Sequence, residues 1–148
     1  YIGNVLPREP LLLRFVRHVS PNVTGLHIPP YSNGFTAVVQ LAKTNPGEPK
    51  NAAMAAFTAH VNIAKVIVVD PDVNIYDPAD ILWALTNRVD WKTDTFLVPG
   101  AQGHEMDPTA DMRGVQTKIG IDATYKPERR PYGERVVYPS VDIKSYLK

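Results

Sequence analysis

One segment of this chain, KVIVVD at residues 65–70, constrains the fold more than any other. Four apolar residues, Val66–Val69, stand in a row between Lys65 and Asp70. A strand without alternation of apolar and polar residues is covered on both faces, as strands of parallel sheets are. A helix is expected soon after it, because Asp77 suits an N-cap and Pro78 the first helical position. Such a strand–helix unit is typical of sheets with helices on both sides.

The remaining segments fit the same architecture. We predict an α/β fold, a three-layer α/β/α domain with a mainly parallel sheet, preceded by a helix and a short hairpin. The strand expected at residues 93–100 would extend the parallel set, and the chain is expected to be loop-rich from Gly100 onward. The other predicted elements are a helix over 9–19, hairpin strands within 23–29 and 35–43, helices over 49–60 and 77–88, a short strand within 118–125, and a helix starting within 140–148.

Composition excludes several classes of function. The chain has 148 residues, enough for one domain, and a net charge of +1 without a basic stripe, which argues against nucleic-acid binding. No apolar run approaches the roughly 18 residues that span a bilayer, so no membrane association and a cytoplasmic location are expected. The chain has no cysteine, which rules out disulfides, thiolate metal sites and cysteine nucleophiles.

Four carboxylates, Asp70, Asp72, Asp77 and Asp80, crowd around the end of the central strand. Ligands of open α/β sheets bind at the carboxyl ends of strands, so these side chains could serve a cation or a phosphate-linked site. They also fit turn and cap chemistry, since a carboxylate is favoured in the first turn of a helix. We favour the structural interpretation.

His104 is the one histidine in a segment that predicts function. It lies in PGAQGHEMDPTADMRG, a loop with three glycines and little packing signal, and such loops often carry function. An exposed loop histidine without a role is an equally good interpretation. Phosphate-binding glycine motifs and nucleophile-elbow motifs are absent from the sequence.

Three segments in order resemble the carboxyl-terminal part of the UbiD family, reversible decarboxylases that use prenylated flavin mononucleotide (FMN). They are TAVVQLAKTNPGEPKNAAMAA (36–56), AKVIVVDPDVNIYDPADILWALTNRVDWKTD (64–94) and HEMDPTADMRGVQTKIGIDAT (104–124), within a likeness from Pro10 to Tyr125. The resemblance implies an amino-terminal domain that holds the flavin, a divalent metal such as Mn or Mg, and a Glu-Arg-Glu set for proton transfer. These 148 residues contain no such domain, so no catalytic residue is assigned to them.

The resemblance implies further roles residue by residue. The GHEM segment matches a substrate-facing segment of the family, which makes His104 and Met106 candidates for the pocket wall. Some members hold a structural potassium ion between two segments: the one that follows the Trp-containing helix, and the strand with the GIDAT sequence. The matching positions are Asp94 and Asp122 through their side chains, and Arg88 and Thr124 through their backbone carbonyls. Hard oxygen ligands of this kind suit such a cation.

One position departs from the family pattern. Many relatives carry a lysine at the position of Ala42, where it reaches the flavin phosphate, whereas here the lysine is Lys43. Successive strand residues point to opposite faces, so a shift of one residue changes the direction of the side chain. Either the loop bends to let Lys43 reach the phosphate, or the contact is lost.

The leading hypothesis is a domain or fragment of a decarboxylase that acts on an aromatic or α,β-unsaturated acid. It would supply the substrate-facing wall and oligomer contacts, partnered by a flavin domain or companion subunit, and would be inactive alone. We expect a single domain with a linker helix (1–22), an α/β core (23–99), and a substrate-side loop, GIDAT strand and tail (100–148). The alternatives are a non-catalytic assembly or regulatory domain of the same fold, and a stand-alone cation-binding module that uses Asp70 and Asp72.

Overall fold

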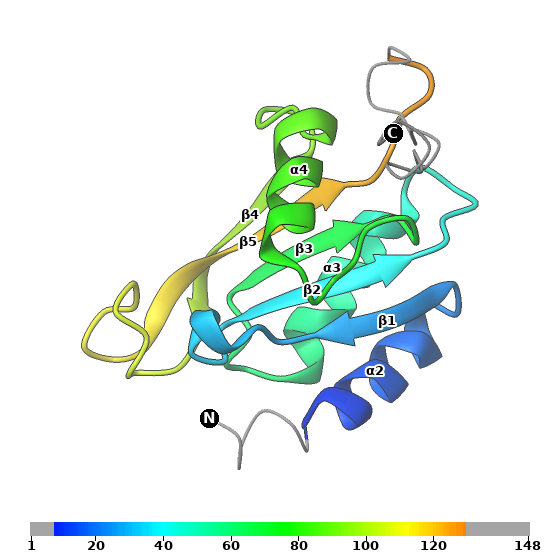
Figure 1. Ribbon diagram of the computed structural model, residues 1–148. Coiled ribbons are helices and arrows are strands. Elements are labelled where there is room, and N and C mark those ends of the chain that lie inside the picture. The colour runs from blue at the N-terminus through cyan, green and yellow to red at the C-terminus, as the bar shows by residue number, and fades with distance from the viewer. Residues whose placement is uncertain (1–7, 130–148) are drawn as a thin grey trace, which may run out of the picture.

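The computed structural model describes residues 8–129, which form one five-stranded sheet with helices on both faces (Figure 1). The residues before Arg8, the tail after Arg129 and the helix expected within 140–148 lie outside the described part. No helix among residues 8–129 is long and apolar enough to cross a membrane. The elements in chain order are α2 (Arg8–Val19), β1 (Val23–His27), the 3-10 helix η1 (Pro30–Ser32), β2 (Thr36–Leu41), α3 (Glu48–Ala59), β3 (Lys65–Val69), α4 (Pro78–Arg88), β4 (Thr95–Gln102) and β5 (Val115–Ala123).

The strand order is β1-β2-β3-β5-β4. The central strands β2, β3 and β5 are parallel, with Val39 opposite Val68 and Val68 opposite Asp122. Both edge strands are antiparallel to their neighbours. The α/β fold and the hairpin of β1 with β2 are therefore confirmed, and the sheet as a whole is mixed.

One expectation about the second half of the chain is wrong, and another is confirmed with a longer strand. The strand predicted at residues 93–100 does not extend the parallel set, because β5 takes the place beside β3 and β4 pairs antiparallel with β5 at the sheet edge. The strand expected within 118–125 is β5, which starts at Val115 and is nine residues long, and the loop of residues 103–114 precedes it. Its middle shows apolar and small residues on both faces, as a central strand requires.

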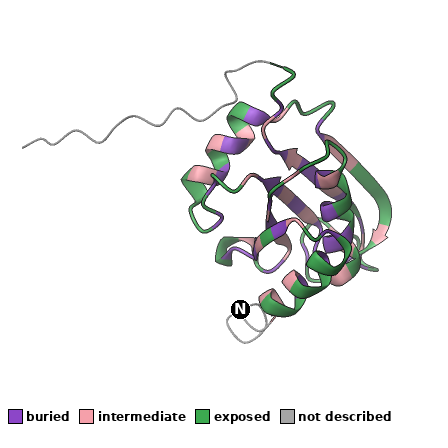
Figure 2. Cartoon of the chain, turned by 90° about the vertical axis from the view of Figure 1, so that its right-hand side faces the viewer, coloured by how far each residue is buried: buried purple, intermediate pink, exposed green. Residues whose placement is uncertain are grey.

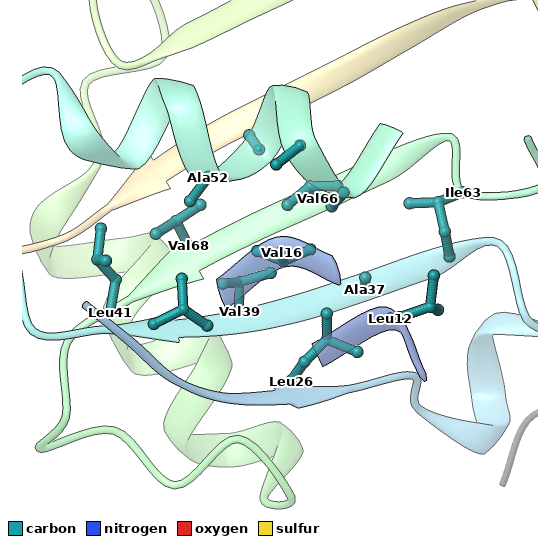
Figure 3. Close-up of a cluster of buried hydrophobic side chains, with 14 of the residues drawn as sticks. Leu12, Val16, Leu26, Ala37, Val39, Leu41, Ala52, Ile63, Val66 and Val68 are labelled. Carbon is teal, nitrogen blue, oxygen red and sulfur yellow. The ribbon is translucent and has the colours of Figure 1, made fainter. Parts of the chain in front are cut away.

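Burial on both faces explains the unbroken apolar run of residues 66–69 in β3. Val66 and Val68 of β3 join the cluster under α2 and α3, where Val39 and Ala52 also lie (Figure 3). Val69 faces the opposite way and packs in the cluster under α4. Buried residues accordingly gather on the central strands and on the inner sides of the helices (Figure 2).

The turn between β3 and α4 is built by the acidic residues predicted to shape it. Asp77 is the N-cap of α4 and its Oδ1 accepts the Ala79 N–H at 3.0 Å. Asp80, in the first helical turn, accepts the Asn74 N–H at 2.7 Å. The turn-and-cap interpretation of these two carboxylates is confirmed.

Candidate functional site

The parallel strands β2, β3 and β5 end at the same side of the sheet, which we call the carboxyl edge. Lys43 follows β2, Asp70 follows β3, and Thr124 follows β5. The Lys43 ammonium donates to Thr124 Oγ1 at 3.0 Å. Open α/β sheets bind ligands at this edge, because the loops after the strands bring side chains together there.

Arg88, the last residue of α4, forms ion pairs with two of the carboxylates at the carboxyl edge. Its guanidinium donates to Asp70 at 2.7 Å and to both oxygens of Asp72 at 2.9 Å. The side chain is almost completely buried, with its charge 4.7 Å from the centre of the Trp83 ring and 5.7 Å from that of Tyr125. The planar guanidinium of Arg88 therefore donates hydrogen bonds to the two carboxylates and also lies against the two aromatic rings.

Asp70 is held by the backbone as well. Its Oδ2 accepts the Tyr125 N–H at 2.6 Å in addition to the bond from Arg88. Burial raises the pKa of Asp70 above its ordinary value, and the Tyr125 N–H and the Arg88 charge oppose that rise. The structure thus gives Asp70 and Asp72 a protein cation as partner, which does not favour the hypothesis of a stand-alone cation-binding module. Among residues 8–129, no three histidine or acidic side chains stand close enough to hold a metal ion.

Three of the four residues implied as potassium ligands, Arg88, Asp94 and Asp122, place oxygen atoms around one ammonium group, that of Lys126. Lys126 Nζ donates to the Asp122 carbonyl at 2.6 Å and to the Arg88 carbonyl at 3.0 Å. It also lies 3.3 Å from Asp122 Oδ1 and 3.4 Å from Asp94 Oδ2. Thr124 contributes its N–H and hydroxyl, which both donate to Asp122 Oδ1. The potassium ion itself stays a prediction.

Asp94 is the most heavily bonded carboxylate of this group. Its oxygens accept two hydrogen bonds from the Arg129 guanidinium and one from the Asp90 N–H at 2.7 Å. Burial alone would raise the pKa of Asp94, but the bonds from Arg129 and Asp90 and the charge of Lys126 outweigh it and lower that pKa. A cavity of about 160 Å³ opens beside this group, and both Asp94 and Asp122 line it.

His104 and Met106 lie away from the carboxyl edge, in the loop of residues 103–114 that joins β4 to β5. That loop precedes β5 and so lies at the amino edge, where the parallel strands begin (Figure 1). His104 Nδ1 accepts the Met106 N–H at 3.0 Å, and its ring centre lies 6.0 Å from that of Phe35. Met106 is 74% exposed. The structure therefore does not bring His104 and Met106 together with Lys43.

The loop nevertheless has a defined shape. Asp107 is buried, and its Oδ1 accepts both the N–H and the hydroxyl of Thr109. Gly103 packs so tightly that an added Cβ would lie 2.0 Å from Gln116 Nε2. The loop that carries His104 is thus held by internal contacts, and the pocket-wall role of His104 stays a prediction.

Comparison with known proteins identifies the group to which the chain belongs. Residues 1–123 match the model of the 3-octaprenyl-4-hydroxybenzoate carboxy-lyase C-terminal domain, the UbiD C-terminal domain. The chain is a member of the UbiD family. The resemblance found in its three sequence segments is thereby confirmed.

Two relatives of this UbiD-family chain are decarboxylases by name. It is 39% identical over 124 residues to anhydromevalonate phosphate decarboxylase of Methanocaldococcus jannaschii, a match that covers 80% of this chain and 29% of the relative. It is 30% identical over 158 aligned positions to gallate decarboxylase of Lactiplantibacillus plantarum, which covers 97% of this chain and 32% of the relative.

Solved structures give the same fold. The UbiD-class enzyme HmfF from Pelotomaculum thermopropionicum, in complex with FMN, matches with a TM-score of 0.82 and 37% identity over 95% of this chain and 32% of HmfF. An evolved dimeric form of HmfF in complex with prenylated FMN (prFMN) matches with a TM-score of 0.73 and 30% identity over 95% of this chain and 29% of that one. This UbiD-family chain spans less than a third of the length of each of these relatives.

Sequence reasoning missed two cations of this UbiD-family chain, Lys126 and Arg129. Lys126 stands four residues after Asp122, and Arg129 is 35 residues from Asp94. No motif marks either residue, because their partners come from separate segments that only the folded sheet brings together. The only local signal is the spacing of Lys126, four residues after Asp122 near the end of β5.

Proposed function

We propose that this chain is the carboxyl-terminal domain of a UbiD-family decarboxylase that acts on an aromatic or α,β-unsaturated carboxylic acid with prenylated FMN. The domain provides a substrate-facing wall and oligomer contacts. The acid and base residues belong to the flavin-binding domain, so this chain is inactive alone. The observation that carries the proposal is the family match over residues 1–123, in a chain that spans less than a third of its decarboxylase relatives.

The loop of residues 103–114 is the proposed substrate-facing wall. Met106 is largely exposed at its surface, and His104 is only partly buried. In a complete enzyme, a covering domain would enclose these side chains together with the substrate. His104 would hydrogen-bond a polar group of the acid, and Met106 would pack on its ring.

Lys43 is the residue of this chain that fits the flavin phosphate. Its ammonium lies at the carboxyl edge, and a lysine binds phosphate as a point charge on a flexible stem. Prenylated FMN, when bound, supplies the electron sink for loss of carbon dioxide. A divalent ion such as Mn or Mg would accompany the phosphate in the amino-terminal domain or companion subunit.

Exposed apolar side chains support contacts with further chains. Leu11, Phe15 and Val19 of α2 are all exposed in this domain, and residues of this kind are enriched where subunits meet. We propose a homo-oligomeric complete enzyme. The three-part organisation into residues 1–22, 23–99 and 100–148 is part of the same proposal.

A domain exchange tests the proposed function. This chain would replace the matching carboxyl-terminal segment of the Lactiplantibacillus plantarum gallate decarboxylase, and the controls are the unchanged enzyme and one without the segment. Carbon dioxide release is measured from gallate and from a panel of aromatic and unsaturated acids, together with the visible absorbance of the flavin. We expect the exchanged enzyme to hold flavin and release carbon dioxide from at least one acid, and the shortened one to do neither.

A folded, flavin-loaded exchange protein without activity on any acid would favour the non-catalytic assembly domain instead. The chain purified by itself adds a second check. We expect a 16.4 kDa species without flavin colour, and a coloured sample would contradict the proposed division of labour.

A further inference from the structure

The ammonium group of Lys126 lies in a site lined by oxygen atoms. Its side chain is buried, and four oxygen atoms surround the ammonium group within 3.4 Å. They are the carbonyls of Arg88 and Asp122, and one carboxylate oxygen each of Asp94 and Asp122. An ammonium group has three N–H donors and no acceptor, so it suits a shell made only of acceptors.

The group joins three segments that are distant in sequence. Arg88 ends α4, Asp94 precedes β4, and Asp122 lies near the end of β5. The Arg88 carbonyl belongs to the last turn of α4, where carbonyls lack helical partners and the helix dipole favours a cation. The single charge of Lys126 therefore links the end of α4, the start of β4 and the end of β5.

Charge balance decides what this site can accept. Two carboxylates, Asp94 and Asp122, face two cations, Lys126 and Arg129, so the group is already neutral. Asp90 and Glu128 also act on Arg129, but both are exposed to solvent. A further cation beside the ammonium would meet its repulsion in a poorly solvated place.

We propose that Lys126 is the resident monovalent cation of this site and takes the place of the potassium ion that the family resemblance implies. The carboxylate and carbonyl shell is the kind of shell that binds an alkali ion, but a covalently attached ammonium group fills it. This domain is then independent of potassium for its stability. The proposal concerns the folded chain alone and does not rest on the proposed enzymatic function.

Removing the ammonium group should recreate a potassium site. Without the Lys126 ammonium, Asp94 and Asp122 face only the single positive charge of Arg129, which leaves one excess negative charge. The four oxygen atoms then surround no cation. Asp94 and Asp122 line the cavity of about 160 Å³ beside the site, so an ion can reach them from solvent. The site in a Lys126→Met variant is therefore expected to take up a monovalent cation of suitable size.

The test is thermal unfolding of the full chain in potassium chloride, sodium chloride and tetramethylammonium chloride at equal ionic strength. We expect the unchanged protein to have the same Tm in all three salts. Lys126→Met should lose several degrees in sodium and tetramethylammonium salts and regain most of that loss in potassium. Lys92→Met, which removes an exposed lysine near the end of α4, is the matched control and should behave as the unchanged protein does.

A double variant separates the oxygen shell from a general salt effect. Lys126→Met with Asp122→Asn restores the charge balance but weakens the shell, so the gain in potassium should disappear. A Lys126→Met variant with the same Tm in potassium and sodium would overturn the proposal. If Lys126→Met does not fold, potassium binding to the unchanged protein is measured by titration calorimetry. No binding is expected there, and a measurable potassium affinity would overturn the proposal.

Discussion

Arg88 shows how one side chain can organise a strand end. It is the common partner of Asp70 and Asp72, it lies against two aromatic rings, and its backbone carbonyl accepts from Lys126. Buried ion pairs add little net stability when compared with apolar replacements, but removal of one partner alone leaves an uncompensated charge. Substitution of Arg88 therefore leaves the charges of both Asp70 and Asp72 without their common partner.

Arg88→Met should destabilise the chain by about 3 kcal/mol, at the lower end of the range for a broken buried pair, because Asp72 is still partly open to solvent. Urea unfolding followed by circular dichroism measures the change. Arg113→Met is the control, since that arginine pairs with Asp111 on the surface, and it should change stability by less than about 0.5 kcal/mol. Equal effects of the two substitutions would show that the Arg88 cluster is not a buried ion pair in solution.

At the scale of elements, the start of α3 is tied to β1 by Glu48. Its carboxylate accepts the side chain and the N–H of Thr44 at 2.7 Å each and the Asn22 amide at 2.8 Å. The bonds from Thr44 and then Asn22 lower the pKa of Glu48 from 4.5 to about 2. This carboxylate therefore connects the first turn of a helix to the start of the edge hairpin.

This connection predicts a loss of stability in acid. The pKa of Glu48 is lower in the folded state than in the unfolded state, so its contribution is complete above pH 4.5 and is lost as the pH falls toward about 2. Glu48→Gln should flatten the fall in Tm over that range. Glu105→Gln, at an exposed loop position, should leave the profile unchanged. A profile of Glu48→Gln that runs parallel to that of the unchanged protein would contradict the prediction.

Elements with local signals could be predicted from sequence, and their partners could not. Asp77 and Pro78 mark the start of α4, and the apolar run marks β3, because both depend on neighbouring residues. The place of β4 at the sheet edge depends on the pairing of β5 with β3, a contact between distant segments that no local pattern encodes. The shell of Lys126 draws on three segments, and for the same reason it was missed.

At the scale of the whole molecule, the candidate residues divide between two opposite edges of one sheet. His104 and Met106 belong to the loop at the amino edge, and Lys43 belongs to the carboxyl edge. A single pocket within this domain cannot hold both groups. In the proposed enzyme they would therefore meet their ligands through different contacts with other domains or chains.

Substitutions at the two edges should have separable effects in the exchanged enzyme. His104→Ala should alter turnover and substrate preference with flavin content unchanged, and Lys43→Met should lower flavin retention. Met112→Ala, at a 96% exposed position of the same loop, and Lys92→Met are the controls. Steady-state kinetics over the acid panel and the flavin absorbance of the purified variants measure these outcomes. Unchanged turnover and preference in His104→Ala would exclude the pocket-wall role.

The central position of β5 also affects how the chain folds. In the folded sheet β3 pairs with β2 on one side and with β5 on the other, and β4 pairs with β5, so both β3 and β4 need residues 115–123 to complete their pairing. Until β5 arrives, β3 and β4 each present unpaired backbone groups, which favour association with other chains. A nascent chain that stops short of Val115 would therefore be the aggregation-prone form of this protein, and insertion of β5 is the step that closes the sheet.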